Sequence, residues 1–474
     1  MNLVSLGAEI IIIATGVFLL AADIVIPHKY RDCIGYISLT SLIIALIFAL
    51  STWAQKADFV LKTVSVDELS MLIRLGIIML GILVNLAAIK NTYTIQHNQG
   101  EFFSLLMFSL AGSMILAGAR ELITIYVGLE LNTIPAFVLV AFRKARPKTG
   151  EAVIKFFILG LLSSAFLLYG LSLVYGLTGQ IDLAKIAQAL NGGLSPALVL
   201  AALFVIAGFG FKITAVPFHF WAPDTYEGAP VVVVAYLATV SKMGAFAVIA
   251  RFFVQGLIIT RVNWPLWFGA LAIITMTLGN MMALPQKNIK RMMAYSGIGS
   301  AGYLLTGFAI GTNYAISAMF FYLIAYAFSA IGIFFVISVY SSRGESDAIS
   351  GYAGMAQTNP ALAAVMLVSF LSLTGIPPLA GFIGKFHLIM AAIQNNQAYL
   401  AVILTINTVI SLAYYGRIMA VMYIKEPDPE RKRVHSPVTT SIALGISIFT
   451  IIYLGIMQSP LLNVARQIFV NVKL

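Results

Sequence analysis

The chain has 474 residues, of which 60% are hydrophobic and only 10% are charged. Apolar runs of about 20 residues, the length that crosses the hydrocarbon core of a bilayer, recur along nearly all of it, which excludes a mainly soluble protein. The net charge of +11 does not indicate nucleic-acid binding, because the basic residues lie mostly in short loops. The single cysteine, Cys33, excludes an intramolecular disulfide and a multi-cysteine iron–sulfur site within this chain.

The apolar runs predict an all-α polytopic membrane protein with about fourteen transmembrane helices. The first run carries Glu9 and Asp23 and follows no basic region, so it indicates a spanning helix rather than a cleaved signal peptide. The twelfth run is interrupted and resumes through about residue 394. The spans lie near 5–26, 33–53, 71–89, 102–119, 121–141, 152–177, 197–217, 229–251, 264–285, 292–310, 313–340, 359–376, 399–423 and 437–457.

Loop charges predict the orientation. With the loop RKARPKTGE after the fifth span in the cytoplasm, fifteen basic residues fall on that side and eight on the other, so both termini are expected outside. The fifteen are Lys29, Arg31, Lys90, Arg143, Lys144, Arg146, Lys148, Lys287, Lys290, Arg291, Arg343, Lys425, Arg431, Lys432 and Arg433. The eight are Lys56, Lys62, Arg120, Lys185, Arg251, Arg261, Arg466 and Lys473.

Six further basic residues lie inside predicted spans. For Arg74 and Arg417, which lie near span ends or among tyrosines, we favour snorkelling or structural pairing. Lys155 begins the sixth span, and the structural and functional interpretations are both open there. The remaining three are deeper, and the cost of an unpaired charge in lipid favours a functional role for them. They are Lys212, Lys242 and Lys385.

Two other titratable residues are candidates to act together with these lysines. Glu130 is in the middle of a span with no charged neighbour in its own helix, so it is expected to pair with a lysine of another span. His219 lies two residues beyond Pro217, and its near-neutral reference pKa suits a proton relay between two lysines. The alternatives are a single structural salt bridge for Glu130 and a satisfied core position for His219.

Two spans are interrupted by proline, each close to a lysine. Pro217 follows Lys212 in the seventh span, and Pro377 and Pro378 precede Lys385 in the twelfth. Interrupted spans at corresponding points of two halves suggest an inverted-repeat transporter. The expected organisation is a three-helix segment at 1–101, a first five-helix repeat at 102–253, a second at 264–423, and a loop with the last span at 424–474.

At this point four stretches resemble a known family: FKITAVPFHFWAPDTYEGAP, YVGLEL, KRMMAYSGIGSAGY and GIPPLAGFIGKF. Together they look like the antiporter-like membrane subunits of respiratory complex I, and the resemblance covers nearly the whole chain. It is strongest with the subunit N (subunit-2-like) branch, because of the length, the fourteen spans and the lysine in the GFIGKF stretch.

The resemblance implies roles for particular residues. Glu130 and Lys212 would form the coupling pair of a first half-channel. Lys242 would be the central relay and Lys385 the terminal site of a second half-channel. His219 would connect Lys212 towards Lys242.

Lys155, in a stretch that also matches the family pattern, would tune Glu130. The chain departs from the family at Asn132 and Thr133, where small or apolar residues are common. That departure leaves the packing around Glu130 open.

The resemblance further implies a proton-translocating subunit of an NADH-quinone oxidoreductase in a bacterial or archaeal cytoplasmic membrane. This chain would bind no cofactor, and quinone, NADH, flavin and iron–sulfur clusters would belong to partner membrane and peripheral-arm subunits. The alternatives are a subunit of a multi-subunit cation/proton antiporter or membrane-bound hydrogenase, a stand-alone secondary transporter, and a structural scaffold.

Overall fold

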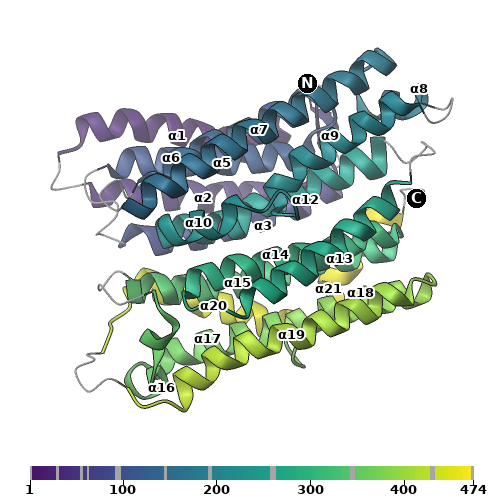
Figure 1. The fold of residues 1–474 in the computed structure, drawn as a ribbon. Helices are drawn as coiled ribbons and strands as arrows, with labels where there is room; N and C mark the ends of the chain where they lie inside the picture. Colours follow the sequence, from purple (N-terminus) through teal and green to yellow (C-terminus); the bar gives the residue numbers. More distant parts are fainter. Residues whose placement is uncertain are drawn as a thin grey trace. The chain divides into compact units, whose positions relative to one another are not determined.

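The computed structural model describes residues 3–27, 31–53, 57–60, 63–90, 98–142, 147–190, 195–256, 263–341, 347–427 and 433–470. Within these residues the chain is almost entirely helical (Figure 1). It divides into two compact units. Unit 1 holds residues 1–213, 240–264 and 474, and unit 2 holds 214–239 and 265–473. The segment 214–239 therefore leaves the first half of the sequence to join the unit built from the second half.

Unit 1 contains the N-terminal helices and a short hairpin. Strands β1 and β2 pair antiparallel, with Ala57 opposite Val66 and Val60 opposite Val64. The bounds are η1 Leu3–Leu6, α1 Gly7–Val25, α2 Asp32–Thr52, β1 Ala57–Val60, β2 Val64–Val66, α3 Glu68–Ile89, α5 Gln99–Gly118, α6 Leu122–Val140, α7 Pro147–Thr178, α8 Leu183–Ala189, α9 Pro196–Ile213, α12 Val240–Ala250 and a π-helical segment at Arg251–Gly256.

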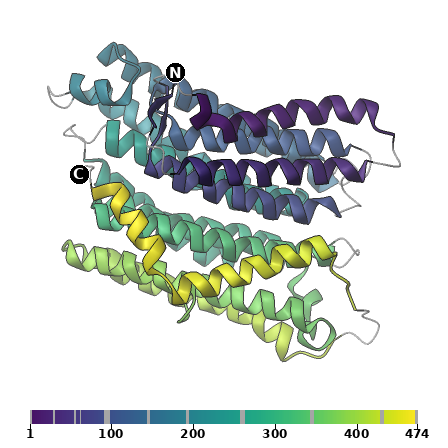
Figure 2. The same cartoon turned by 180° about the vertical axis from the view of Figure 1, so that it is seen from behind.

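Unit 2 is arranged around α15, a 29-residue helix whose whole apolar stretch is buried. Helices α11, α14, α17, α18, α20 and α21 all pack against it. Figure 2 shows α20 and α21, in yellow, as two successive helices that meet at a bend. The bounds are α10 Trp221–Gly228, α11 Val231–Ala238, α13 Trp264–Ala283, α14 Ile289–Ile310, α15 Asn313–Ser341, η4 Ile349–Tyr352, α16 Met355–Thr358, α17 Pro360–Thr374, α18 Ala380–Gln394, α19 Ala398–Tyr423, α20 Val438–Ile456 and α21 Ser459–Val470.

Each of the fourteen predicted spans coincides with helix in the described residues, and the all-α membrane class is confirmed. Within the part of the chain that the structure describes, twelve helical stretches are long and apolar enough to cross a membrane, judged by length and composition alone. The tenth span is α14, which begins with Lys290 and Arg291, and the twelfth is the pair of shorter helices α17 and α18. The count of fourteen crossings and the two repeats stay predictions.

The two predicted interruptions share one backbone pattern. Helix α9 ends at Ile213, followed by Thr214 with φ +62° and by Pro217 three residues later. Helix α17 ends at Thr374, followed by Gly375 with φ +90° and by Pro378 three residues later. The bonds preceding both prolines are cis. A left-handed residue ends a helix by turning the chain away, and proline cannot continue it, so each span is divided at the same local feature.

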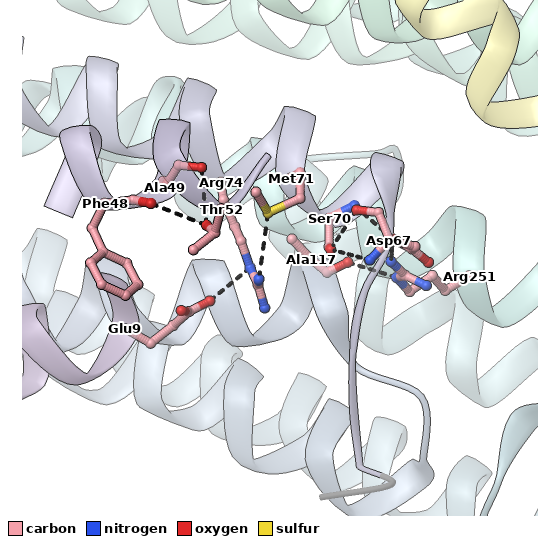
Figure 3. A network of polar contacts seen from close by, with 10 residues as sticks. All are labelled: Glu9, Phe48, Ala49, Thr52, Asp67, Ser70, Met71, Arg74, Ala117 and Arg251. Atoms are coloured by element: carbon pink, nitrogen blue, oxygen red, sulfur yellow. Dashed lines mark hydrogen bonds and ion pairs between the residues drawn. The ribbon is translucent and has the colours of Figure 1, made fainter. Parts of the chain in front are cut away.

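Two arginines are buried in unit 1 with acidic partners (Figure 3). Arg74 Nε lies 2.7 Å from Glu9 Oε1, which joins α3 to α1, and the two side chains are 1% and 5% exposed. Arg251 Nη2 pairs with Asp67 Oδ1, and its Nε donates to the carbonyl of Ala117. Structural pairing of Arg74 is thus confirmed. The prediction that Arg251 lies in a loop is wrong, because the eighth span continues into the π-helical segment and buries it.

The orientation was predicted from basic loop residues, and several of these lie outside the described residues. The orientation of the termini therefore stays a prediction. Those outside are Lys29, Lys56, Lys62, Arg143, Lys144, Arg146, Arg261, Arg343, Arg431, Lys432 and Lys473.

Candidate functional site

Lys212 lies in the last turn of α9 and is 5% exposed. Its Nζ donates a hydrogen bond of 2.8 Å to Thr133 Oγ1 on α6. Glu130, one turn earlier on α6, interacts electrostatically with Lys212. Within the described part of the chain, however, the two groups form no direct ion pair, and Glu130 Oε1 has no hydrogen-bond partner. The direct contact of Lys212 is thus a threonine on the helix that carries Glu130, and the pairing of Glu130 with Lys212 stays a prediction.

Asn132 fixes the rotation of α6. Its Nδ2 donates to Ser113 Oγ at 2.6 Å and to the Ser109 carbonyl at 2.9 Å, both on α5. Its Oδ1 accepts from Ser241 on α12 at 2.9 Å. The departure from the family pattern at Asn132 is therefore a buried amide that joins three helices and has its hydrogen bonds satisfied.

Glycines allow these three helices to approach closely. A Cβ on Gly112 would lie 2.3 Å from the backbone nitrogen of Asn132, and one on Gly244 would lie 2.8 Å from the Ser113 carbonyl oxygen. Neither position has room for a side chain. Helices α5, α6 and α12 therefore meet at Asn132, the residue that precedes Thr133 in the chain.

Lys242 follows Ser241 on α12 and is 1% exposed. Just before it, the eighth span is interrupted: α11 ends at Ala238 and α12 begins at Val240. The residue between them, Thr239, has φ −121° and ψ −75°, and its hydroxyl donates to the Ala235 carbonyl at 2.6 Å. The sequence predicts a continuous span here, because no proline or glycine marks the interruption.

Lys385 lies on α18 beside the end of α17 and is 3% exposed. Its Nζ donates to the carbonyl oxygens of Leu373 at 2.8 Å and Thr374 at 3.3 Å. The last carbonyls of a helix have no partner within the helix, and they attract positive charge. The interruption at Gly375 therefore creates the acceptors that hold this lysine.

Polar side chains of α13, α14 and α19 form a hydrogen-bonded cluster next to Lys385. The lysine Nζ lies 4.5 Å from the centre of the Tyr303 ring. Asn280 donates to the Tyr303 hydroxyl and accepts from Tyr414, both at 2.9 Å. Tyr415 makes a further hydrogen bond to a serine of α14. This cluster cannot be recognised in the sequence, because single tyrosines and asparagines in apolar helices show no recognisable spacing.

Two further predicted site residues, Lys155 and His219, make other contacts. Lys155 is 42% exposed, and its Nζ pairs at 2.6 Å with Glu151 on its own helix. His219 is half-buried in the turn after Pro217, and its ring lies 4.6 Å from that of Phe220. Their predicted roles, tuning Glu130 and linking two lysines, stay predictions.

The predicted relay residues are divided between the units. Unit 1 holds Glu130, Lys155, Lys212 and Lys242, and unit 2 holds His219 and Lys385 with all three prolines of the interruptions. In the described residues no three His, Cys, Asp or Glu side chains converge as a metal site would require.

Comparison with known proteins shows the family. The family model described as "NADH:quinone oxidoreductase/Mrp antiporter, TM" matches residues 119–411, more than half of the chain. The chain belongs to this family. The match begins in front of α6 and ends within α19, so Glu130, Lys212, Lys242 and Lys385 all lie inside the part typical of the NADH:quinone oxidoreductase/Mrp antiporter proteins.

Individual relatives match nearly end to end. NADH-quinone oxidoreductase subunit N of Moorella thermoacetica is 39% identical, with 98% of each chain covered. F(420)H(2) dehydrogenase subunit N of Methanosarcina mazei is 33% identical, with 98% of this chain and 97% of the relative covered. A chain of respiratory complex I from Thermus thermophilus with bound Aureothin has a TM-score of 0.82 and 28% identity, covering 97% of this chain and 99% of its own.

Proposed function

We propose that this chain is a proton-translocating membrane subunit of an NADH-quinone oxidoreductase of complex I type. The observation that carries the proposal is the setting of three lysines, Lys212, Lys242 and Lys385. Each is almost fully buried, and each lies next to an interrupted transmembrane helix. Ionisable groups at membrane depth are costly and mark ion pathways, and relatives named subunit N match nearly the whole length of the chain.

The proposed mechanism passes a proton along Glu130, Lys212, His219, Lys242 and Lys385. Two unit charges 4 Å apart interact by about 4 kcal/mol at an effective dielectric constant of 20. Moving one charge against 100 mV costs about 2.3 kcal/mol. Forming and breaking one lysine–carboxylate contact is therefore sufficient to drive a proton uphill.

In this proposal, partner subunits supply the energy for proton translocation. Quinone reduction takes place in other membrane and peripheral-arm subunits, where quinone, NADH, flavin and iron–sulfur clusters are bound, and this chain contributes no redox site. The complex lies in the cytoplasmic membrane of a bacterium or archaeon, with both termini of this chain outside. As a subunit, the chain takes part in a translocase reaction.

Alanine substitution of Lys212 or Lys242 in the assembled complex tests the proposal. Each variant is expected to abolish or strongly reduce proton pumping and coupled quinone reductase activity, because the relay loses its titratable group. Pumping is measured with a pH-sensitive dye in vesicles, and assembly by the amount of purified complex. The control is Lys185→Ala on α8, whose side chain is exposed. Wild-type pumping in both buried-lysine variants would discard the relay.

Glu130 tests the role of charge in the same assay. Glu130→Asp keeps the carboxylate and is expected to reduce pumping less than Glu130→Gln. Equal effects of the two substitutions would show that the charge of Glu130 is not what matters.

The alternatives differ in partners and in electron donor. A cation/proton antiporter or hydrogenase subunit of the same family would copurify without quinone-site subunits. A donor other than NADH is a specific variant of the proposal, because one relative is named F(420)H(2) dehydrogenase subunit N. A stand-alone carrier would transport when expressed alone in vesicles, and a scaffold would leave pumping unchanged in the lysine variants.

A further inference from the structure

Lys212 is held by a neutral hydroxyl although a carboxylate lies on the same helix turn. The direct partner of its ammonium is Thr133 Oγ1, at 2.8 Å. Glu130 interacts with it electrostatically but makes no direct ion pair with it in the described part of the chain. The Oε1 atom of Glu130 is buried, and it has no hydrogen-bond partner among the residues that the structure describes. The ammonium and the carboxylate are therefore close together but not in direct contact.

The two candidate acceptors lie on one face of α6. Residues three apart on a helix are neighbours, so Glu130 and Thr133 are presented side by side to α9. The Thr133 hydroxyl donates its own hydrogen to the Leu129 carbonyl at 2.6 Å, which leaves its lone pairs for Lys212. Thr133 can thus act only as an acceptor towards the lysine in this arrangement.

The position of Thr133 is fixed by its neighbour in the chain. Asn132 is completely buried and points to α5 and α12, where it is bonded to Ser113 and Ser241. Rotating α6 to exchange the acceptor would break these hydrogen bonds. An exchange of acceptor between Thr133 and Glu130 would therefore require the lysine and glutamate side chains to move while helix α6 stays fixed.

We propose that Thr133 is the alternative acceptor of Lys212, which holds the lysine when its contact with Glu130 is open. Thr133 is then a positioning residue of the relay, and this inference rests on the proposed function. A hydrogen bond to a charged group is worth considerably more than one between neutral groups. Without the hydroxyl, the open arrangement loses the hydrogen bond that holds the ammonium, and the lysine stays with the carboxylate.

Thr133→Val in the assembled complex tests the inference, since valine keeps the branched shape and lacks the hydroxyl. We expect pumping at neutral pH to fall at least about tenfold, the size of one such hydrogen bond. Because the closed ion pair retains the proton, the pH of half-maximal pumping should rise by about one unit. Thr133→Ser keeps the hydroxyl and should restore both values. If the valine variant does not assemble, Thr133→Ala carries the same test without adding bulk.

The matched control is Thr306→Val on α14. Thr306 is 1% exposed like Thr133, and its hydroxyl donates to a carbonyl of its own helix, that of Tyr303. A merely structural role predicts that Thr133→Val behaves like Thr306→Val, with an unshifted pH profile. That result, or failure of Thr133→Ser to restore pumping, would overturn the inference while Lys212→Ala still abolishes pumping. Normal pumping in Lys212→Ala would instead overturn the proposed function.

Discussion

At the scale of single residues, the basic side chains within the helices of this chain have two different kinds of partner. Arg74 and Arg251 have acidic partners and join helices, and Arg417 donates to the carbonyls of Leu284 and Gln286. The lysines Lys212 and Lys385 are instead held by a hydroxyl or by carbonyls. A guanidinium stays charged at all accessible pH values, whereas an ammonium on neutral acceptors can lose its proton at small structural cost. The kind of cation, guanidinium or ammonium, thus distinguishes the arginines that join helices from the lysines that are proposed to titrate.

Asp67 gives a pH-dependent prediction at this scale. Burial acts to raise the pKa of Asp67, but the charge and hydrogen bond of Arg251 and the backbone of Ser70 outweigh it, so the net pKa lies well below the usual range. A lowered pKa means that the carboxylate stabilises the fold above about pH 4 and that this contribution is lost as the pH falls further.

We therefore expect residues 63–75 to lose protection from hydrogen exchange below about pH 4 in the wild-type complex. Asp67→Asn should exchange faster at pH 7 and show no such step. Exchange corrected for its intrinsic pH dependence is the measurement, and Glu68→Gln, at an exposed neighbouring position, is the control. An acid step that persists in Asp67→Asn would assign it to another group.

At the scale of elements, interruptions create the lysine sites. The end of α17 supplies two carbonyls to Lys385, and this requires α18 to approach α17 closely. A Cβ on Gly381 would lie 1.9 Å from the Ser372 carbonyl oxygen, and one on Gly455 would lie 2.0 Å from that of Pro378. Glycine at these points is what allows α18 and α20 to pack against the interruption.

Gly381→Ala is expected to reduce pumping about tenfold to a hundredfold, because it displaces α18 and with it the ammonium of Lys385. Pumping and assembly are measured as for the lysine variants. Gly416→Ala on α19 is the control, since nothing in the described chain lies within 4 Å of the added carbon. Unchanged pumping in Gly381→Ala would show that the close approach is not needed for function.

At the scale of the whole molecule, the predicted repeats and the two compact units have different boundaries in the sequence. The predicted repeats end at 253 and begin again at 264, but residues 214–239 pack within unit 2. In that unit α10 is bound to α14, because Arg291 Nη1 contacts Asp224 at 2.6 Å and Glu227 at 3.0 Å. Helix α11 packs against α15. The expected repeat boundaries stay a prediction, supported by the matching pattern of the two interruptions.

Because Arg291 pairs with both Asp224 and Glu227, we expect single and double substitutions of these acids to affect the stability of α10 differently. Asp224→Asn or Glu227→Gln alone leaves one ion pair and should change little, because partly exposed pairs are worth about 1 kcal/mol or less. The double variant should clearly increase hydrogen exchange in residues 221–228. Additive small effects in the double variant would show that the two acids act independently.

The sequence by itself determined the membrane class, the approximate positions of the helical stretches, both proline interruptions and the titratable residues worth testing. It could do so because the cost of an unsatisfied charge or backbone group in lipid is severe and restricts composition locally. Only the tertiary structure decided the partner of each charge: Thr133 for Lys212, two carbonyls for Lys385 and Asp67 for Arg251. Those partners come from helices distant in the sequence, and no spacing along one helix encodes which faces meet. The interruption at Thr239 also escaped prediction, because neither proline nor glycine marks it.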